Sequence, residues 1–396
     1  MTFERPPRVA LLIETARGYG RAVLRGIARY SRLHGPWNFL LTPGDFVQTL
    51  PKTPDWHGDG VIARTLDGAM AERLAAMGVP VVFLDFPVDS IETTAKLSSD
   101  GRCVDLTSDS VGAAKMAAEY LLEKKLRNFA YAGYPFQRWS IAREAAFADA
   151  IREAGFTPNV YRPPLRFGRP LCWEKEEQFL CEWLKSLPKP VGVMACNDQR
   201  GREILDACES VGIRAPEQLA VIGVDADDLL CELCSPPLTS VALNAEKGGF
   251  MAAMALDAMM HGRTPDERHI LVEPMNVVER RSTNIVLVED EDVAEALRLI
   301  HTGRLETLTV ERIAREIPVS RRQLEVKFRK FHGRTMLEEL QLVRIERAKQ
   351  MLRETDASMD RVAQTVGFSA TSYFLQTFRK HVGSSPSKYR HEVRGE

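Results

Sequence analysis

The feature that most constrains the fold is a basic pattern, Phe-Arg-Lys-x-x-Gly, that occurs twice near the end of the chain, at residues 328–333 and 378–383. Upstream of it, residues 314–320 match residues 363–369 at an offset of 49, whereas the two basic patterns are 50 residues apart. One residue has therefore been inserted in the second copy, ahead of its basic pattern. The end of the chain must hold two copies of one small structural unit.

Each copy has the pattern of two short helices separated by a tight turn. The first helix carries apolar residues at helical spacing, and the second is opened by a serine, Ser320 or Ser369. Ser320 and Gln323 have the spacing of a capping box. The apolar positions of the first helices are Val310, Ile313, Ala314 and Ile317 in one copy and Met359, Val362, Ala363 and Val366 in the other. The pattern predicts two helix-turn-helix units.

The second helix of each unit is expected to enter the major groove of DNA, where only its outward positions reach the bases. The candidate base-reading residues are Arg321, Arg322, Gln323 and Glu325 in the first unit and Thr371, Ser372 and Gln376 in the second. Arginine can form two hydrogen bonds with guanine, glutamine can form two with adenine, and glutamate can accept one from cytosine. Each such contact contributes about 1–3 kcal/mol of discrimination against the other bases. Arg329, Lys330, Arg379 and Lys380 are expected to contact phosphates, and Leu324, Phe328, Phe374 and Phe378 to face inward. One basic helix alone is usually a solvated surface, but a matched pair favours DNA binding.

Further residues of this region carry a family resemblance. They are Arg344, Ala348, Leu352, Gly367, Phe368, Ser369, Tyr373, Phe374, Phe378, Arg379, Lys380, Gly383, Pro386, Tyr389 and Arg390. Over roughly residues 292–392 the chain resembles the AraC-type DNA-binding domain. The resemblance implies an all-α domain in which a long helix, here about 335–354, joins two helix-turn-helix units that reach successive major grooves about 34 Å apart.

Two details bear on the geometry of this region. The inward positions of the long helix are expected to be Leu337, Leu340, Val343 and Ala348. Pro318 stands where the family usually has glycine or a small polar residue. Because proline fixes φ near −65°, the geometry of the first turn stays open.

Charge is distributed unevenly along a chain whose formal net charge is only −1. From Ala296 onward there are 20 lysines and arginines against 12 acidic residues, whereas the rest of the chain has 33 against 42. A basic end on an acidic body is typical of a nucleic-acid reader fused to another domain. The acidic run 289–292 indicates a connection, so we expect domains at 1–285 and 295–396 with an acidic linker at 286–294.

The sequence does not indicate export, membrane contact or a metal site. The apolar run near the N-terminus, 9–13, is too short for a signal peptide, and no segment approaches the roughly 18 apolar residues that span a bilayer. The seven scattered cysteines fit reduced thiols. Cys231 and Cys234 lack the further ligands that a metal site needs. We therefore expect a cytoplasmic protein with no cofactor, no metal and no membrane contact.

The first 285 residues alternate between short apolar runs and amphipathic stretches. The runs 9–13, 79–84, 129–132, 191–195 and 219–224 are typical of buried parallel strands, and helical patterns lie near 20–34, 67–77, 108–125, 140–154, 174–186, 198–211 and 245–261. This alternation predicts α/β layers. At this length we expect two doubly wound lobes, a ligand cleft beyond the carboxyl ends of their strands, and a loop at 87–102 near which the chain crosses between lobes.

Four fragments carry a second resemblance. They are Arg143-x-x-x-Phe147, Cys196-Asn197-Asp198, the run 221–225 and the run 236–241. Over roughly residues 8–283 the chain is similar to the LacI-type regulatory core, which shares the two-lobed periplasmic-binding-protein fold. A sensor of this kind ahead of an AraC-type reader, together with Arg138-Trp139 and residues 279–283, resembles the regulators of the XylR type, which respond to xylose.

A sugar pocket needs groups that pair several hydroxyls at once. Arg143 offers a planar fork of donors, Asp225 two acceptor oxygens, and Asn197 one donor group and one acceptor. By the resemblance these three positions contact the sugar, although Arg143 could instead form a surface ion pair. Asp198 is expected to cap the helix that follows it.

A sugar also needs a flat side chain against one face of its ring. Trp139 and Trp173 are the candidates for this stacking surface, and each could instead be a core residue. Tyr19 and Arg21, at the opening of the first helix, are candidates to close the cleft from the other lobe.

Together these patterns predict a sugar-responsive transcriptional regulator and not an enzyme. D-Xylose is the best candidate effector, with another monosaccharide as the alternative. The expected partners are double-stranded DNA, a second copy of the chain in a homodimer, and RNA polymerase if the regulator is an activator. A transport-type solute-binding protein would not need the basic end. An α/β enzyme is disfavoured because the sequence has no phosphate loop, no Gly-x-Ser-x-Gly elbow and no His-Glu-x-x-His motif.

Overall fold

The computed structural model describes residues 5–41, 57–64, 72–74, 76–85, 102–166, 169–170, 173–285 and 290–394. The chain divides into two compact units, Met1–Ile285 and Val286–Glu396. The predicted helix at 67–77 and the predicted loop at 87–102 lie largely outside the described residues.

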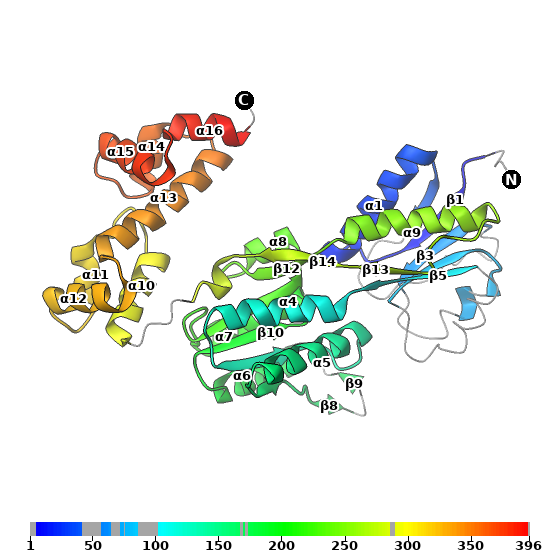
Figure 1. The fold of residues 1–396 in the computed structure, drawn as a ribbon, viewed down its shortest axis with the longest axis horizontal. Helices are drawn as coiled ribbons and strands as arrows, with labels where there is room; N and C mark the ends of the chain where they lie inside the picture. Colours follow the sequence, from blue (N-terminus) through cyan, green and yellow to red (C-terminus); the bar gives the residue numbers. More distant parts are fainter. Residues whose placement is uncertain are drawn as a thin grey trace. The chain divides into compact units, whose positions relative to one another are not determined.

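Among the described residues, the first unit contains two six-stranded sheets, each at the centre of one lobe (Figure 1). In lobe 1 the order is β13-β5-β4-β3-β1-β2, and every neighbouring pair is parallel. Its strands are β1 (Arg8–Leu12), β2 (Asn38–Leu41), β3 (Gly60–Arg64), β4 (Val81–Leu84), β5 (Cys103–Ser108) and β13 (His269–Val272). Helices α1 (Gly18–His34) and α9 (Ala245–Met260) pack against one face of this sheet.

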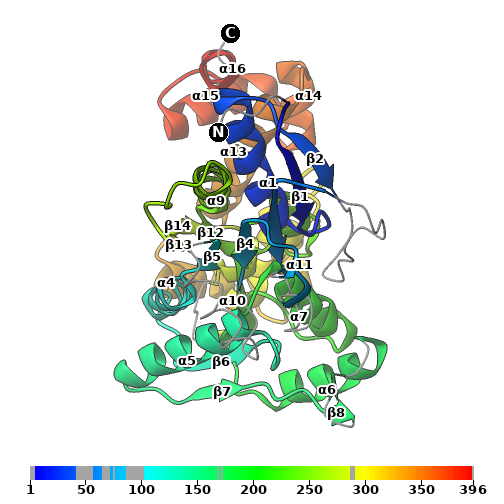
Figure 2. The same cartoon turned by 90° about the vertical axis from the view of Figure 1, so that its right-hand side faces the viewer.

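The sheet of lobe 2 has the order β14-β12-β11-β10-β6-β7 and is parallel except for its edge strand β14. Its strands are β6 (Asn128–Ala132), β7 (Pro158–Val160), β10 (Val191–Ala195), β11 (Leu219–Asp225), β12 (Thr239–Leu243) and β14 (Pro274–Val278). Helices α4 (Ser110–Glu123) and α5 (Arg138–Glu153) cover one face, and α6 (Trp173–Ser186) and α7 (Asp198–Ser210) the other (Figure 2). The smaller elements are the strand pair β8 (Leu165–Arg166) and β9 (Arg169–Pro170), helix α8 (Asp228–Leu233) and the 3-10 turn Arg281–Thr283.

The central strands are buried on both faces, because successive side chains of a strand point in opposite directions. In β1, Val9 and Leu11 belong to the core shared with α1 and α9, whereas Ala10 and Leu12 belong to a core on the opposite face. Such strands read as continuous apolar runs, and the predicted α/β architecture is confirmed. The strands absent from the sequence prediction have short runs or runs interrupted by polar residues such as Asp105 in β5.

Within the described residues the chain passes between the lobes three times. β5 of lobe 1 leads into α4 of lobe 2, β12 of lobe 2 leads into α9 of lobe 1, and β13 leads into β14. Within lobe 1, α1 and α9 meet backbone to backbone. A Cβ atom on Gly26 would lie 2.0 Å from the carbonyl oxygen of Glu246, and one on Gly249 would lie 2.1 Å from that of Val23. Glycine at both positions is therefore what allows these two helices to pack as one layer.

The second unit is helical throughout residues 290–394, apart from its turns (Figure 1). Its helices are α10 (Glu291–Thr302), α11 (Val310–Glu316), α12 (Arg321–His332), α13 (Met336–Glu354), α14 (Met359–Thr365), α15 (Thr371–Val382) and α16 (Pro386–Arg394). Helices α10 to α12 share one core with the start of α13, and α14 to α16 share another with its end. The two predicted helix-turn-helix units and the long helix that joins them are confirmed.

The starts of the two second helices differ. The predicted capping box is present, with the Gln323 N–H donating to Ser320 Oγ at 3.3 Å and the Ser320 N–H donating to Gln323 Oε1 at 3.2 Å. The prediction that Ser369 opens the other helix is wrong, because Ala370 is the N-cap of α15 and offers no side-chain oxygen. The extra residue therefore lies in the turn before this cap, which comprises residues 317–319 in the first unit and 366–369 in the second.

The two turns also differ. After α11, Ile317 is extended, with φ −110° and ψ 132°, and the Val319 N–H donates to Ile317 O at 2.8 Å around Pro318. After α14 the chain turns through Gly367, whose φ is +86°. Proline at 318 thus accompanies an extended connection, whereas the second unit uses a left-handed glycine.

In the long helix α13 the predicted inward residues Leu340 and Ala348 are buried and Val343 is half-buried. The prediction for Leu337 is wrong, since its side chain is 49% exposed. The buried stripe of α13 advances in steps of four, through Met336, Leu340, Arg344, Ala348 and Leu352. Leu337 lies beside this stripe at the start of α13 and faces solvent, whereas Ile345, two turns later on the same side, is buried in the core of the second unit.

Helix α10 begins inside the segment 286–294 that the sequence suggested as a linker. Asp290 is its N-cap, and the Asp290 carboxylate accepts from the N–H groups of Asp292 and Val293 at 3.1 and 3.3 Å. Acidic residues are favourable at a helix N-terminus because of the helix dipole. Residues 290–292 of the acidic run therefore form the start of a helix.

Gly367→Ala should destabilise the helical unit much more than Gly383→Ala. A Cβ at Gly367 would lie 1.9 Å from Leu305 O, whereas a Cβ at Gly383, whose φ is +81°, would meet open space. We expect losses of about 3 kcal/mol and about 1 kcal/mol, respectively. Urea unfolding of the full-length protein, followed by circular dichroism, measures both. Equal losses would contradict the close contact with Leu305.

Candidate functional site

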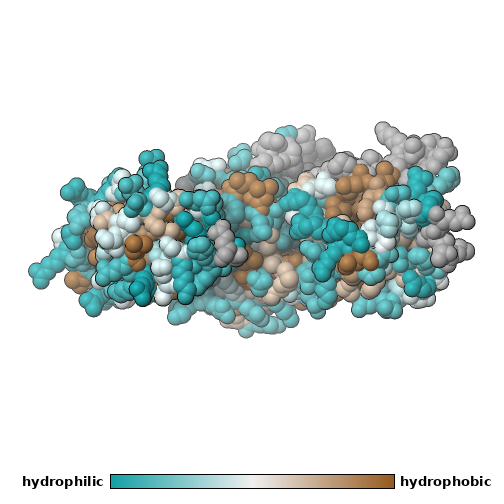
Figure 3. Space-filling model, turned by 90° about the horizontal axis from the view of Figure 1, so that it is seen from above, coloured by the Kyte–Doolittle hydropathy of each residue, from teal (hydrophilic) through white to brown (hydrophobic). Residues whose placement is uncertain are grey.

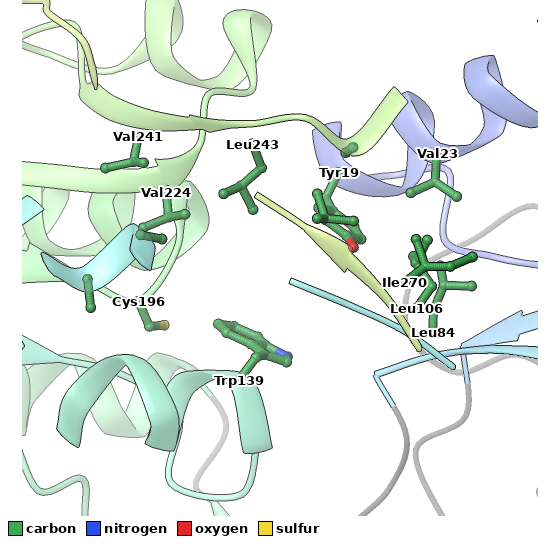
Figure 4. Packing of buried hydrophobic residues seen from close by; sticks show 14 of the residues in the cluster. Tyr19, Val23, Leu84, Leu106, Trp139, Cys196, Val224, Val241, Leu243 and Ile270 are labelled. Carbon is green, nitrogen blue, oxygen red and sulfur yellow. The ribbon is translucent and has the colours of Figure 1, made fainter. Parts of the chain in front are cut away.

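A small polar cavity lies between the two lobes, at the carboxyl ends of their parallel strands. Lobe 1 lines it with Glu14, Arg17, Tyr19, Arg64, Asp85 and Ser108, and lobe 2 with Trp139, Arg143, Asn197 and Asp225. Ligands of doubly wound sheets bind at this edge. Figure 4 shows Tyr19, from α1, and Trp139, from α5, on opposite sides of the space between the lobes.

Arg64, at the end of β3, is the centre of the lobe 1 side. Its guanidinium lies 3.1 Å from the carboxylate of Glu14, 3.0 Å from that of Asp85, and 5.1 Å from the centre of the Tyr19 ring. Burial alone would lower the pKa of Arg64, but the two carboxylates raise it above its usual value. Sequence reasoning found only Tyr19 of this group. Arg64 ends a buried strand, Asp85 directly follows one, and Glu14 comes two residues after one, and that position is the signal that could have identified them.

Arg143 and Asp225 form the centre of the lobe 2 side. Arg143 is 2% exposed, donates from Nη1 to Cys196 O at 2.5 Å, and lies with its guanidinium 5.0 Å from the centre of the Trp139 ring. Its Nη2 is 4.0 Å from the Asp225 carboxylate and 3.4 Å from Ser108 Oγ of lobe 1. Arg143 is therefore a buried residue that faces both lobes, and the alternative of a surface ion pair is excluded.

Asn197 and Asp198 open α7 in roles that differ from the prediction. Asn197 is the N-cap, and its Oδ1 accepts from the Arg200 N–H at 2.9 Å. The prediction that Asp198 caps the helix is wrong. The Asp198 carboxylate turns away from the first turn and accepts from Ser240 Oγ at 2.5 Å and from the Asp227 N–H at 2.7 Å. Asp198 thus fixes the loop that follows Asp225.

Among the described residues, three buried donors of the cavity lining have neither a hydrogen-bond partner nor an ion-pair partner. They are Tyr19 Oη, Trp139 Nε1 and Arg143 Nε. An unpaired buried donor costs about 1–3 kcal/mol, so such atoms are rare unless a ligand or water pairs with them. Burial raises the pKa of Tyr19 well above its usual value, so the hydroxyl remains a donor. The free space is about 20 Å³, so the surrounding groups must separate to admit a ligand larger than water.

Asp225 is held in an unusual state. Its φ is +109°, which residues other than glycine rarely adopt. Burial raises the pKa of its carboxyl to about 6, although Arg143 and Arg64 act in the opposite direction. Backbone strain and displaced pKa values both cluster at functional sites. A ligand that donates hydrogen bonds to this carboxylate would offset part of the free-energy cost of burying its charge.

Two predicted residues have other positions. Arg21 is not among the residues that line the cavity. Its Nη2 lies 2.8 Å from each carboxylate oxygen of Asp227, so it joins α1 of lobe 1 to the loop after β11 of lobe 2. Trp173 begins α6, and its side chain lies outside the part of the chain that the structure describes.

The outward faces of α12 and α15 are mostly polar, although Val326, Tyr373 and Leu375 are also exposed, and the face of this unit that Figure 3 shows is largely hydrophilic. The predicted DNA-facing residues Arg321, Arg322, Gln323, Glu325, Arg329, Lys330, Ser372, Gln376, Arg379 and Lys380 are exposed, and Thr371 is half-buried. Arg321 lies 2.9 Å from both Glu325 and Glu311. Thr371 Oγ1 donates to the Asp360 carboxylate at 2.5 Å.

Within the described residues, no group of three or more His, Cys, Asp or Glu side chains could hold a metal ion. Cys231 and Cys234 are buried free thiols. Among the helices that the structure describes, none is both long enough and apolar enough to cross a membrane.

Family comparisons match successive parts of the chain. Residues 8–97 match the XylR N-terminal domain, residues 118–283 match the periplasmic binding protein-like domain, and residues 313–392 match a helix-turn-helix domain.

Individual proteins match over nearly the whole chain. The xylose operon regulatory protein of Escherichia coli strain K12 is 30% identical over 392 residues, which cover 98% of each chain. That of Haemophilus influenzae is 27% identical over 386 residues, 97% of this chain and 98% of the relative. The solved structure of the xylose-binding transcription activator xylR is similar, with a TM-score of 0.81 at 29% identity over 98% of this chain and 99% of that one. The CelR–cellobiose complex shares the fold, with a TM-score of 0.55 at 22% identity over 70% of this chain and 85% of that one.

Asp225→Asn should stabilise the first unit near neutral pH. Burial raises the pKa of the carboxyl from 3.8 to about 6. The protonated carboxyl is compatible with burial, so its contribution to the free energy of unfolding is fully present below about pH 4 and is lost as the pH rises through 6. The amide cannot ionise and should gain about 3 kcal/mol at pH 7.5 and well below about 1 kcal/mol at pH 4. Urea unfolding at the two pH values measures the difference. A loss of stability at pH 7.5 would mean that the attraction of Arg143 outweighs the effect of burial.

Proposed function

Because this chain belongs to the family of xylose operon regulatory proteins, we propose that it is a sugar-responsive transcriptional regulator whose effector is D-xylose. The observation that carries the proposal is the interlobe cavity, which combines buried unpaired donors with carboxylates from both lobes. A sugar hydroxyl can donate to a carboxylate and accept from an arginine, a tyrosine or an indole N–H at the same time.

The charge of the cavity favours a neutral ligand. Its lining carries three positive residues, Arg17, Arg64 and Arg143, and three negative ones, Glu14, Asp85 and Asp225. A sugar phosphate or a sugar acid would bring an additional buried charge without a partner, which costs several kcal/mol. A neutral monosaccharide keeps the balance.

We assign Arg143, Asp225 and Asn197 of lobe 2 and Tyr19 of lobe 1 to the hydroxyls of the sugar. We assign the stacking surface to Trp139 in preference to Trp173, since Trp139 lines the cavity. The Arg143 guanidinium covers one face of the Trp139 ring, and the other face is the one we assign to the sugar.

The sugar acts by favouring the closed arrangement of the two lobes. A ligand shifts an equilibrium only by its differential affinity for the two states, and this cavity has contacts from both lobes only when they are together. Arg21 supports closure from the cavity mouth, because its paired contact with Asp227 also joins the lobes. We expect opening to break this contact.

The helical unit reads DNA through α12 and α15 in successive major grooves. We place its boundary at Asp290 and not at 295, since α10 packs into its first core. A homodimer would present two such units to paired sites, and an activator would in addition contact RNA polymerase. We propose that the protein acts in the cytoplasm, where promoter DNA is found, and that it releases the sugar unchanged.

D-Xylose should raise the melting temperature of the wild-type protein by several degrees at saturating concentration, because it binds only the folded state. Asp225→Ala should abolish this shift and the effect of xylose on DNA binding, while sugar-free DNA affinity changes less than about twofold. A thermal-shift screen over pentoses and hexoses, paired with fluorescence anisotropy on DNA, measures both. A normal xylose response in the variant would remove Asp225 from the site, and a selective hexose response would change the assigned effector.

Arg322 and Lys330 should have different effects on DNA binding. Arg322 lies in the first turn of α12 and forms no ion pair among the described residues, so Arg322→Ala should cost about 1–3 kcal/mol on selected DNA and much less on random DNA. Lys330→Ala should weaken binding to selected and random DNA alike. It should also reduce the slope of the logarithm of the binding constant against the logarithm of the salt concentration by about 1. Anisotropy titrations at several salt concentrations measure this. Equal losses of Arg322→Ala on both DNAs would contradict base reading.

A further inference from the structure

Helix α10 belongs to the first helix-turn-helix unit only. Its buried residues Val293, Ala296, Leu297 and Ile300 lie in the core that contains Leu324 and Phe328 of α12. As far as the described side chains go, the core of the second unit contains no residue of α10. Whatever moves α10 therefore acts on the core of the first unit, which includes the recognition helix α12.

The chain between the sensor and α10 is short. Ile285 is buried in the large core of the first unit, with 9% of its surface exposed, and Asp290 caps α10 five residues later. Five residues span at most about 18 Å when fully extended. A displacement of the sensor end that exceeds the slack of this segment must pull on the start of α10.

The start of α10 is tied directly to the recognition helix. Lys327 of α12 lies with its Nζ 2.9 Å from the Asp290 carboxylate and 2.5 Å from that of Asp292. The Lys327 side chain is 36% exposed and the two aspartates are 15% and 20% exposed. The three groups form a partly buried cluster, so salt should screen it less than a fully exposed pair.

The end of α10 is tied to the other end of the recognition helix through one buried carboxylate. Glu339, in the first turn of α13, lies 3.3 Å from His301 of α10, 3.0 Å from His332 at the end of α12 and 3.2 Å from Arg334. Its side chain is 8% exposed. The carboxylate is at a helix N-terminus and the two histidines are at helix C-termini, which is the favourable arrangement for all three helix dipoles.

Within residues 290–394, neither ionic tie recurs in the second unit. Helices α13 and α16 begin fifty residues apart, at Met336 and Pro386, so Tyr389 takes the place of Glu339 and Thr377 that of Lys327. The Tyr389 ring packs against Phe378 at 5.7 Å between centres, and Thr377 is buried. A ring contact, with one long hydrogen bond from Arg353 Nη2 to Tyr389 Oη at 3.5 Å, stands where the first unit has an ionic contact.

We infer that the sensor controls DNA binding through the first helix-turn-helix unit, with Lys327 and Glu339 as positioning residues that couple α10 to the recognition helix α12. The inference rests on the proposed function, because it needs a sugar-dependent change in the sensor. The second unit then anchors the protein on DNA with a geometry that depends little on the sugar.

The test compares the effect of D-xylose on DNA affinity in full-length variants. The DNA is a duplex that the wild-type protein selects from random sequence, and the response is the ratio of Kd values with and without xylose. Lys327→Gln and the double variant Asp290→Asn/Asp292→Asn should each bring this ratio of Kd values at least threefold closer to one. Asparagine can still cap α10, so the double variant removes the ionic tie without removing the cap or changing α12.

Three further variants separate coupling from general damage. Lys327→Arg keeps the ionic tie and should restore the response, whereas Glu339→Gln should reduce it like Lys327→Gln. Lys388→Gln breaks the pair of Lys388 with Glu392 in α16, removes the same charge in the second unit, and should leave the response unchanged. The xylose-induced thermal shift should stay within about 1 °C of wild type in all of them, because the sugar site is intact.

The outcomes distinguish the two proposals. A wild-type protein that neither binds xylose nor changes its DNA affinity overturns the proposed function. A normal wild-type response that persists in Asp290→Asn/Asp292→Asn and in Glu339→Gln overturns only the coupling through α10. A loss in Lys388→Gln as large as that in Lys327→Gln also overturns it, because the effect would then follow net charge and not position.

Discussion

The need to compensate buried charge is the constraint on which the rest of the structure depends. Parallel strands bring their polar carboxyl ends to one edge of a sheet, and two such edges face each other here. A buried ion without a partner costs several kcal/mol. Lobe 1 meets this cost by itself, since Arg64 has two carboxylates within 3.1 Å. Lobe 2 meets it less completely, with Arg143 and Asp225 4.0 Å apart. The incompletely paired side is where the hydroxyls of a sugar gain most.

Much of the architecture could be predicted from local patterns. The repeated basic motif indicated two copies of one unit, and the spacing of Ser320 and Gln323 located a helix start, because both depend on residues close in sequence. Glu14, Arg64 and Asp85 could not be found in this way. Their meeting depends on the order of β1, β3 and β4 in the sheet, which no local pattern reveals. The error at Leu337 has a similar origin, since several apolar residues compete for one helical stripe and only packing decides between them.

The two helix-turn-helix units show how one design can serve two tasks. The buried aromatics Phe328 and Phe378 keep the same place in both units. The polar groups around them differ: a capping box against an uncapped start, and a proline turn against a left-handed glycine. The apolar centre of each unit fixes its shape, whereas the surrounding polar contacts determine what the unit is connected to. A duplication in which only these outer contacts change gives one unit that can respond to the sensor and one that can stay bound to DNA.

The close contact of α1 with α9 has a mechanical consequence. Backbones that touch at Gly26 and Gly249 leave no side-chain layer that could slide or be compressed. The α1–α9 layer should therefore move as one rigid body, and we expect the bending that separates the lobes to occur in the three segments that, within the described residues, pass between them. Small changes of backbone torsion in these connections produce large displacements at the far end of lobe 1. A sugar bound close to the connections can therefore control the position of the lobe with only a few hydrogen bonds.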